Sequence, residues 1–415
     1  MAPSASVSLP GFLSDLPNDA DQVQSVLAIR HPDYTARLTP WTVLLDAFEG
    51  AGGFLDGSYL WPYPSESAED FAKRKSMARF HNYISPLVEL YTRYLWTDGV
   101  DRQSNSEEYN AWTRDVDGAG TSLDDLLKRL VSVALVHGHA GVLVDKTAAE
   151  PSGPTKADEQ SRVIASVFTA LAIADWRFDT DGLAAVKLLE APPAVSILAD
   201  TPTGDEAVQY LIWDREGYAR FNHEGTRVGA DTPGLGLVPL VILRPQPSYA
   251  SAMTGRPLMG DAKVHLALFN RPSEEDEVLR TQAFSLLTVS VAADGNVQEA
   301  KTDIGTAIGT SKAIVVQGDI AYQTPDQNVP GTIRANIEYL VQEVYRAAHV
   351  PYSVNSLQRD SGESRRMQYT ELNEMLQGIG KALAAAERQI ARCWFAWMFP
   401  TADAAEAAFE AAEVE

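Results

Sequence analysis

Cysteine is almost absent from the sequence. A single cysteine, Cys393, stands among 415 residues, so neither an intrachain disulfide framework nor a cysteine-built zinc site is possible. Its neighbours Trp394, Phe395 and Trp397 are aromatic. This setting favours a buried thiol that packs as a small apolar side chain.

Basic residues are also scarce. Lysine and arginine number 34 against 56 aspartate and glutamate residues, which gives a net charge of −22. Tight, sequence-independent binding to phosphate backbones requires clustered basic side chains. We therefore expect no such binding, although an acidic protein can still let DNA slide past it. Solubility alone also explains an acidic excess.

Long apolar runs are missing as well. No stretch of about 18 apolar residues is present, which argues against a transmembrane helix. The first residues, MAPSASVSLPGFLSDLPNDADQ, contain neither a basic segment nor an apolar core, which argues against a signal peptide. We expect a chain that is made and kept in a reducing compartment.

Motifs for catalysis and for cofactor or metal binding are missing too. The segment GTAIGTSK, with Gly305, Gly309 and Lys312, lacks the spacing of a phosphate-binding loop. His137 and His139 have no third ligand at a suitable spacing, so the end of a helix is the better interpretation. Residues 179–182 favour a hairpin turn over a calcium loop. We expect no enzyme activity, no cofactor and no metal site.

The chain is long enough for about two or three domains, and its patterns predict an α+β fold. Residues 1–29 are rich in Pro, Ser and Asp and predict a flexible arm. Helices are expected over 39–48, over 71–85 with a new or kinked helix after Pro86, and from an N-cap at Ser122 to about Gly138. Between 162 and 245, short apolar runs separated by turn signals predict a mostly antiparallel sheet.

Two helices joined by a polar loop dominate the C-terminal part. The first, over 331–350, places Ile333, Ile337, Leu340, Val341 and Val344 on one face and ends before Pro351. The second, over 363–399, is about 55 Å long. Its apolar face exceeds what the first helix covers, so the surplus implies another domain, a neighbouring subunit, or both. Gly378 and Gly380 predict a bend in it.

A further helix is expected over 258–283, ahead of a compact α/β region over 284–330. Leu258, Ala262, Leu266 and Phe269 share one face of this helix. Pro272 lies inside it and is expected to kink or break it. After Phe399 the acidic tail is either a last helix or a frayed end.

These stretches, taken in order, resemble the portal proteins of tailed bacteriophages. The segments HPDYTARLTPWTVLLDAFEG and YLWPYPSESAEDFAKRKSMARFHNYISPLVELYTRYLW look like the N-terminal region of that family. The helix that precedes HGHAG resembles the element that follows this N-terminal region in portal proteins. VPLV with the helix after it resembles the start of its stem, and 331–399 resembles its second stem helix, tunnel loop and long bent helix. The similarity covers most of residues 30–399.

The resemblance implies a division of the chain into the parts of a portal subunit. After the arm, it implies a wing over 30–257, a first stem helix over 258–283, a clip over 284–330 and a second stem helix over 331–350. The remaining parts would be a tunnel loop over 351–362, a long bent helix over 363–399, and an acidic tail over 400–415 in place of a full crown. The implied DNA-facing residues are Asn355, Ser356, Gln358, Arg359 and Asp360. The implied packing residues of the stem and of the subunit contacts are Leu266, Phe269, Ile337, Leu340 and Val344.

The resemblance also implies a function and its partners. A portal is a homo-oligomeric ring, typically a dodecamer, at one vertex of a virion capsid. Double-stranded DNA passes through its channel during genome packaging and ejection. The large terminase subunit docks on it first, and neck or adaptor proteins follow. No membrane is involved, and assembly takes place in the host cytoplasm.

Two other classes of function stay open. The helical hairpin could belong to a different virion protein, such as a head–tail adaptor without a DNA channel. The many carboxylates could include a catalytic pair of an acidic hydrolase, but they are scattered as on solvated surfaces. A pair at catalytic separation cannot be identified without a fold.

Overall fold

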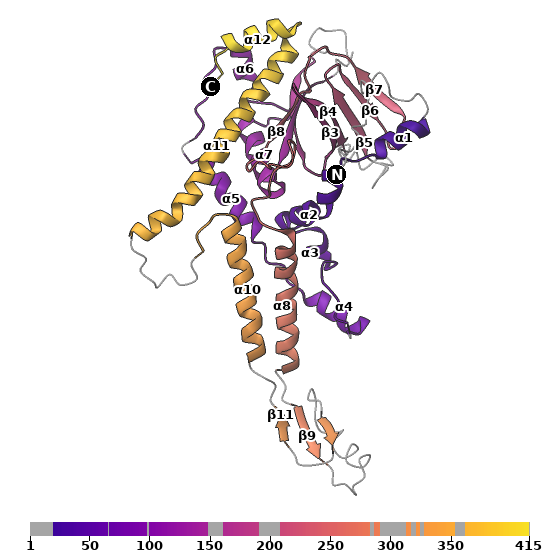
Figure 1. Ribbon diagram of the computed structural model, residues 1–415, viewed down its shortest axis with the longest axis vertical. Coiled ribbons are helices and arrows are strands. Elements are labelled where there is room, and N and C mark those ends of the chain that lie inside the picture. The colour runs from indigo at the N-terminus through magenta and orange to yellow at the C-terminus, as the bar shows by residue number, and fades with distance from the viewer. Residues whose placement is uncertain are drawn as a thin grey trace, which may run out of the picture.

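The computed structural model describes residues 20–414, except 65, 98, 148–160, 191–207, 283–285, 291–312, 317–320, 324–327 and 353–361. A body of helices and two sheets carries a stalk of two helices, and a small sheet lies at the far end of the stalk (Figure 1). Helices and mostly antiparallel strands therefore occupy largely separate parts of the chain, which agrees with the expected α+β class.

The helices differ in length from one turn to 37 residues. Their bounds are α1 Ala20–Ala28, α2 Pro32–Glu49, α3 Gly52–Asp56, α4 Ala68–Met77, α5 Ile84–Leu95, α6 Glu107–Trp112, α7 Leu123–His137, α8 Ala262–Gln282, α10 Asn328–Ala347, α11 Gly362–Met398 and α12 Ala402–Ala411.

Helix α7 forms where its end signals predict it. The Ser122 hydroxyl accepts a hydrogen bond from the Asp125 amide, as an N-cap does. The helix ends at His137, and Gly138 follows with a φ of 91°. A side chain at Gly138 would meet the backbone of Gly255, so both the left-handed conformation and the close approach require glycine here. The expected helix end at His137 is confirmed.

Two antiparallel sheets form the β part of the body. One has the strand order β2-β1-β8 and the other the order β3-β4-β5-β6-β7. The short turn between Asp179 and Gly182 joins β3 and β4, so the expected hairpin is confirmed. The strands are β1 Ala140–Lys146, β2 Val163–Thr169, β3 Ile173–Asp179, β4 Gly182–Glu190, β5 Gln209–Asp214, β6 Tyr218–Phe221, β7 Arg227–Asp231 and β8 Leu240–Leu243.

The main core lies between α7, the first sheet and the long helix α11. Leu130 and Val131 of α7, Val142 of β1 and Ile390 of α11 are all fully buried in one cluster. The Trp397 indole donates a hydrogen bond to the Val144 carbonyl at 2.8 Å and ties α11 to β1. Cys393 lies in this core, and burial raises the pKa of its thiol to about 12. The expectation of a buried thiol that packs as a small apolar side chain is confirmed, and a raised pKa makes such a thiol unreactive.

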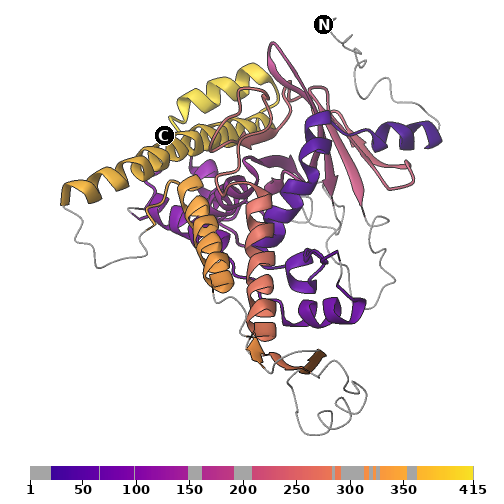
Figure 2. The same cartoon turned by 60° about the horizontal axis from the view of Figure 1, so that its bottom comes forward.

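The stalk consists of α8 and α10, which lie side by side in both views (Figures 1 and 2). The expected break at Pro272 is wrong, because α8 is one helix from Ala262 to Gln282. Proline removes one helical hydrogen bond, but α8 is held by packing against α10 and by polar contacts with the segment before α4.

The described part of the predicted clip is a sheet with the strand order β10-β9-β11. Strand β9 (Leu286–Ser290) pairs in parallel with β10 (Ala313–Val316) and antiparallel with β11 (Ala321–Gln323). The Ala/Gly-rich segment around Ile304 to Gly309 lies outside the described residues, as does Lys312.

The N-terminal half contains several differences from the sequence prediction. Residues 20–28 form helix α1 within the predicted flexible arm, because Val23 and Leu27 are buried against the second sheet. Helix α2 begins at Pro32 and continues through Pro40. Helix α4 ends at Met77, and α5 starts only at Ile84, with Pro86 in its first turn. The tail after Phe399 forms the helix α12, with Thr401 as its N-cap.

Candidate functional site: the two-helix stalk and the long helix

The five predicted packing residues of the stem all lie on the stalk and contact the core of their own chain. Phe269 and Val344 are buried, and Leu266, Ile337 and Leu340 are half-buried against the same cluster. The ring centroid of Phe269 lies 5.3 Å from that of Phe54 and 6.2 Å from that of Phe80, so this side chain packs toward α3 and the segment after α4. The roles of the five residues in packing the two stem helices together and in contacts between subunits stay predictions.

The top of the stalk is anchored to the body through the end of α10. The buried Tyr91 hydroxyl on α5 donates a hydrogen bond to the Ala348 carbonyl, and burial raises the pKa of Tyr91. The Val350 amide donates to the Tyr345 carbonyl, and the His349 amide donates to the Arg346 carbonyl. This pair of bonds is a Schellman ending, which needs a left-handed residue, and His349 supplies it with a φ of 52°.

The chain beyond this ending leads into the predicted tunnel loop. The five predicted DNA-facing residues, Asn355, Ser356, Gln358, Arg359 and Asp360, lie outside the described residues. Near this loop, His349 Nδ1 lies 3.7 Å from the carboxylate of Glu371 on α11.

A buried polar cluster fixes the segment between α3 and α4 to the side of α8. The Asn270 side chain accepts a hydrogen bond from the Trp61 amide at 2.8 Å and donates to the Tyr59 carbonyl at 3.0 Å. It also donates to the Leu266 carbonyl on its own helix. The Asn270 side chain, two residues before Pro272, thus bonds backbone groups of two segments.

Arg74 on α4 completes this polar cluster. Its guanidinium binds both carboxylate oxygens of Glu66 at 2.7 and 2.8 Å and donates to the Trp61 carbonyl at 2.6 Å. Its Nη1 lies 3.4 Å from the Ser273 hydroxyl on α8. The side chains of Arg74 and Glu66 are only 3% and 6% exposed. The hydrogen bonds from Arg74 hold the pKa of Glu66 below its usual range, so the pair stays charged.

The charge of the stalk differs from that of the whole chain. Together α8 and α10 contain five basic and six acidic residues, whereas the whole chain has a net charge of −22. Ion pairs neutralise many of these charges. Examples are Arg271 with Glu274, Arg280 with Glu277, Arg334 with Glu275 and Arg346 with Glu343. The stalk is therefore almost neutral inside an acidic protein.

The apolar face of α11 packs against the chain itself. Leu372, Ile379, Ile390 and Trp394 are buried, and the remaining described apolar positions of the predicted face are half-buried. Helix α11 packs against α5, β1, β8 and α12. Another part of the same chain therefore covers the buried positions of this face, and a contact of the half-buried positions with a neighbouring subunit stays a prediction. Helix α11 also continues through Gly378 and Gly380 without a break.

The described residues contain no group of three or more His, Cys, Asp or Glu side chains that could hold a metal ion. His137 and His139 are buried, and burial lowers their pKa values to about 4 and about 3. None of the described helices is long and apolar enough to span a membrane.

Sequence reasoning missed the cluster of Arg74, Glu66 and Asn270. In the sequence these are ordinary polar residues of a helix or a loop, and nothing in their spacing shows that they are buried. One signal was available, namely the run Trp61-Pro62-Tyr63-Pro64, because two prolines beside a tryptophan indicate a stiff loop with an aromatic anchor.

Comparison with protein-family models and with curated proteins gives no match. Among solved structures, the chain is similar to a chain in the virion of a native gene transfer agent particle, with 12% identity and a TM-score of 0.38. That similarity covers 90% of this chain and 88% of the other. A chain in the neck of an empty gene transfer agent particle, computed with C6 symmetry, gives 13% identity and a TM-score of 0.39, with 88% of each chain covered. Scores of this size carry no argument about fold or function.

Proposed function

We propose that the chain is the subunit of a portal, a ring-shaped channel in the virion of a tailed phage or phage-like particle. The observation that carries the proposal is the stalk. Helices α8 and α10 project from the body side by side, with a small sheet at their far end (Figure 1). Helix α10 then returns to the body and leads into the predicted tunnel loop and α11. This is the order of parts expected from the resemblance to portal proteins.

The charge distribution supports passage of DNA rather than capture of it. Clustered basic side chains would hold a polyanion tightly and resist its movement. The chain as a whole is acidic and the stalk is almost neutral. A channel lined by such surfaces has no deep electrostatic well for the phosphate backbone.

In this proposal the protein is structural and has no enzyme activity of its own. The energy for DNA packaging comes from a separate motor, the large terminase subunit, and neck or adaptor proteins dock later. The ring, with about twelve copies in the portal family, stands at one capsid vertex. The loop with Gln358 and Arg359 is the part that we assign to the DNA.

Negative-stain electron microscopy of the purified protein, combined with native mass measurement, tests the proposal. We expect closed rings of many copies around an open channel at least about 20 Å wide, since the major groove of a DNA duplex alone is about 12 Å wide. Closed oligomers without a channel would contradict the portal assignment and favour a head–tail adaptor.

The adaptor is the second candidate because the buried apolar positions of α11 need no neighbouring subunit to cover them. A helical hairpin can pack in an adaptor without surrounding DNA. The substitution Arg359→Glu separates the two in the intact particle. A portal variant should assemble but fill with less DNA, whereas normal filling would contradict the assignment of the loop.

A further inference from the structure

Trp61 is an exposed aromatic side chain on a fixed backbone. It is 53% exposed, yet its amide donates to Asn270 and its carbonyl accepts from Arg74. Pro62 and Pro64 restrict the chain that follows. A tryptophan held in this way loses little conformational freedom on binding, and tryptophan is enriched among residues that dominate protein interfaces.

Other exposed apolar residues lie on the same segment. Leu55 of α3 is 80% exposed and Met77 of α4 is 47% exposed. Residues 73–79 include four basic side chains and no acidic one. Of these, Lys73 and Arg79 are exposed and form ion pairs with Glu69 and Asp276. We name the surface formed by Leu55, Trp61, Met77, Lys73 and Arg79 the Trp61 edge.

A surface of opposite character lies across the stalk. Three exposed tyrosines lie here: Tyr339 on α10, Tyr352 after the end of α10, and Tyr369 on α11. Tyr339 is 56% exposed. The carboxylates of Glu338, Glu371 and Glu374 belong to the same elements and are exposed too. We name this surface, formed by these three tyrosines and three glutamates, the tyrosine edge.

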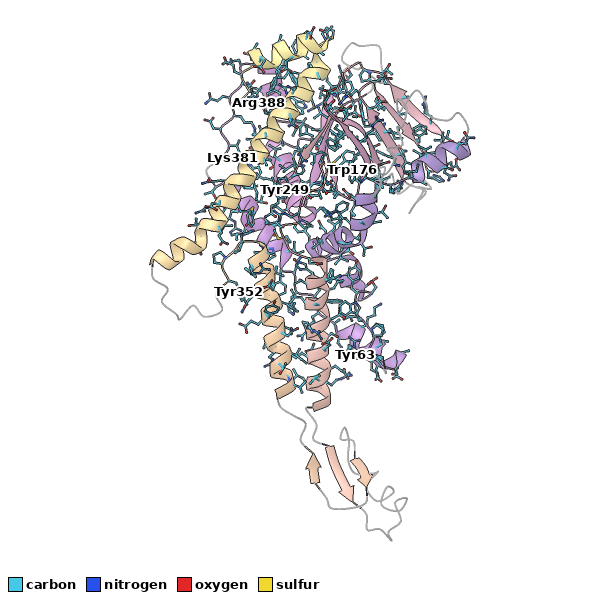
Figure 3. The ribbon with its side chains drawn as sticks, viewed as in Figure 1. Tyr63, Trp176, Tyr249, Tyr352, Lys381 and Arg388 are labelled. Atoms are coloured by element: carbon cyan, nitrogen blue, oxygen red, sulfur yellow. The ribbon has the colours of Figure 1, made fainter. Side chains whose placement is uncertain are left out.

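The two edges lie on opposite sides of α8. In Figures 1 and 2, α3 and α4 lie on one side of α8, and α10 with the N-terminal end of α11 lies on the other. Figure 3 labels Tyr63 beside the first edge and Tyr352 on the second. Two complementary surfaces on opposite sides of one subunit permit a head-to-tail contact between copies.

We propose that the Trp61 edge of one copy docks against the tyrosine edge of the next copy. The occupant is a second copy because the chain itself presents both halves. One has apolar side chains beside the side chains of Lys73 and Arg79, and the other has tyrosines beside the carboxylates of Glu338, Glu371 and Glu374. Head-to-tail contacts close into a ring when the rotation between copies allows it. The inference rests on the proposed ring and specifies the faces that build it.

The first test is Trp61→Ala, measured by the protein concentration at which half of the chains are in rings. The substitution should raise that concentration about tenfold or more, while circular dichroism and the melting temperature of the monomer stay unchanged. Tyr249→Ala is the matched control, because Tyr249 is fully exposed on the segment between β8 and α8, outside both edges. Rings that form equally well with Trp61→Ala would overturn the inference.

Charge reversal provides a second test that leaves Trp61 in place. Lys73→Glu with Arg79→Glu should weaken ring formation, and so should Glu371→Lys with Glu374→Lys. All four substitutions together should restore it, because each edge then meets its opposite charge again. Loss without restoration would contradict direct pairing of the two edges.

The two proposals fail in different ways. If the wild-type chain forms rings and neither set of variants affects them, only the assignment of the edges is wrong. If the wild-type chain forms closed oligomers without a channel, and Trp61→Ala disrupts these, the edges are right and the portal function is wrong.

Discussion

Helices α8 and α11 each contain residues that disfavour a helix, and each remains continuous by a different means. In α11, Gly378 and Gly380 flank Ile379, which is completely buried in the core of the body. In α8, Pro272 lies between Asn270 and Ser273, which take part in polar contacts with the segment before α4. Apolar burial supports one helix, and buried hydrogen bonds contribute to the other. We therefore expect α8 to be destabilised by substitutions that remove buried polar partners, and α11 by substitutions that remove buried apolar side chains.

The largest effect is expected at the polar cluster beside α8. Arg74→Met leaves the buried Glu66 carboxylate without its partner, and breaking a buried ion pair in this way costs about 3–5 kcal/mol. Chemical denaturation measures the free energy of unfolding. Lys73→Met, at the exposed neighbouring position, is the control and should change it by about 0.5 kcal/mol or less. A loss below about 1 kcal/mol for Arg74→Met would mean that the cluster does not stabilise the stalk.

The matching test in α11 removes apolar contacts. Ile390 is fully buried, so Ile390→Ala should cost about 2–5 kcal/mol through lost burial and a new cavity. The control is Gln389→Ala at the exposed neighbouring position. If Ile390→Ala is tolerated without loss, the packing of α11 on the body is looser than the burial of this face indicates.

Part of the acid sensitivity should arise in the body, at His139. The pKa of His139 is about 3 in the folded protein and about 6.5 when it is unfolded. The unfolded state therefore binds more protons between these values, and stability falls as the pH drops below about 6.5. Between pH 8 and pH 5 this one histidine should account for a loss of about 2 kcal/mol.

His139→Phe tests the source of this pH dependence. Phenylalanine keeps a ring against Trp41, whose centroid lies 5.2 Å from the imidazole. It removes two ring nitrogens that have no hydrogen-bond partner within the described part of the chain. The difference in unfolding free energy between pH 8 and pH 5 should shrink by about 2 kcal/mol but not vanish, since burial also lowers the pKa values of His137 and His265, which titrate in the same direction. An unchanged difference would assign the acid sensitivity to other groups.

The smallest effect concerns the predicted bend of α11. Nothing lies within 4 Å of the position that a Cβ atom would occupy at Gly378, so Gly378→Ala should stabilise the helix by about 1 kcal/mol. Gly331→Ala, in the equally open setting of α10, is the comparison. A loss of stability at Gly378 alone would show that the glycine is needed for a bent shape.

Local signals in the sequence predicted local structure well. Ser122 and Gly138 marked the ends of α7, and the turn residues after Asp179 marked a hairpin. The helical spacing of the apolar residues over 331–350 predicted the face of α10 that is turned toward the core. These features depend on neighbours within a few residues, and such neighbours are visible in a sequence.

Features that depend on distant residues were missed or wrongly predicted. Pro272 was expected to break α8 because the support from Asn270 and Arg74 involves residues about 200 positions apart. Helix α1 was taken for flexible chain because its two buried residues, Val23 and Leu27, pack on strands that come much later. The predicted DNA-facing residues are the part of the site that the described structure does not test.

A cryo-electron microscopy reconstruction of the assembled oligomer tests the central claim most directly. It would show which helices line the channel and how wide the channel is. Our account predicts a closed ring in which α8 and α10 surround an opening wide enough for a DNA duplex, with Trp61 of each copy against the tyrosine edge of the next. A ring whose stalks point away from the axis, or an oligomer without an opening, would contradict it.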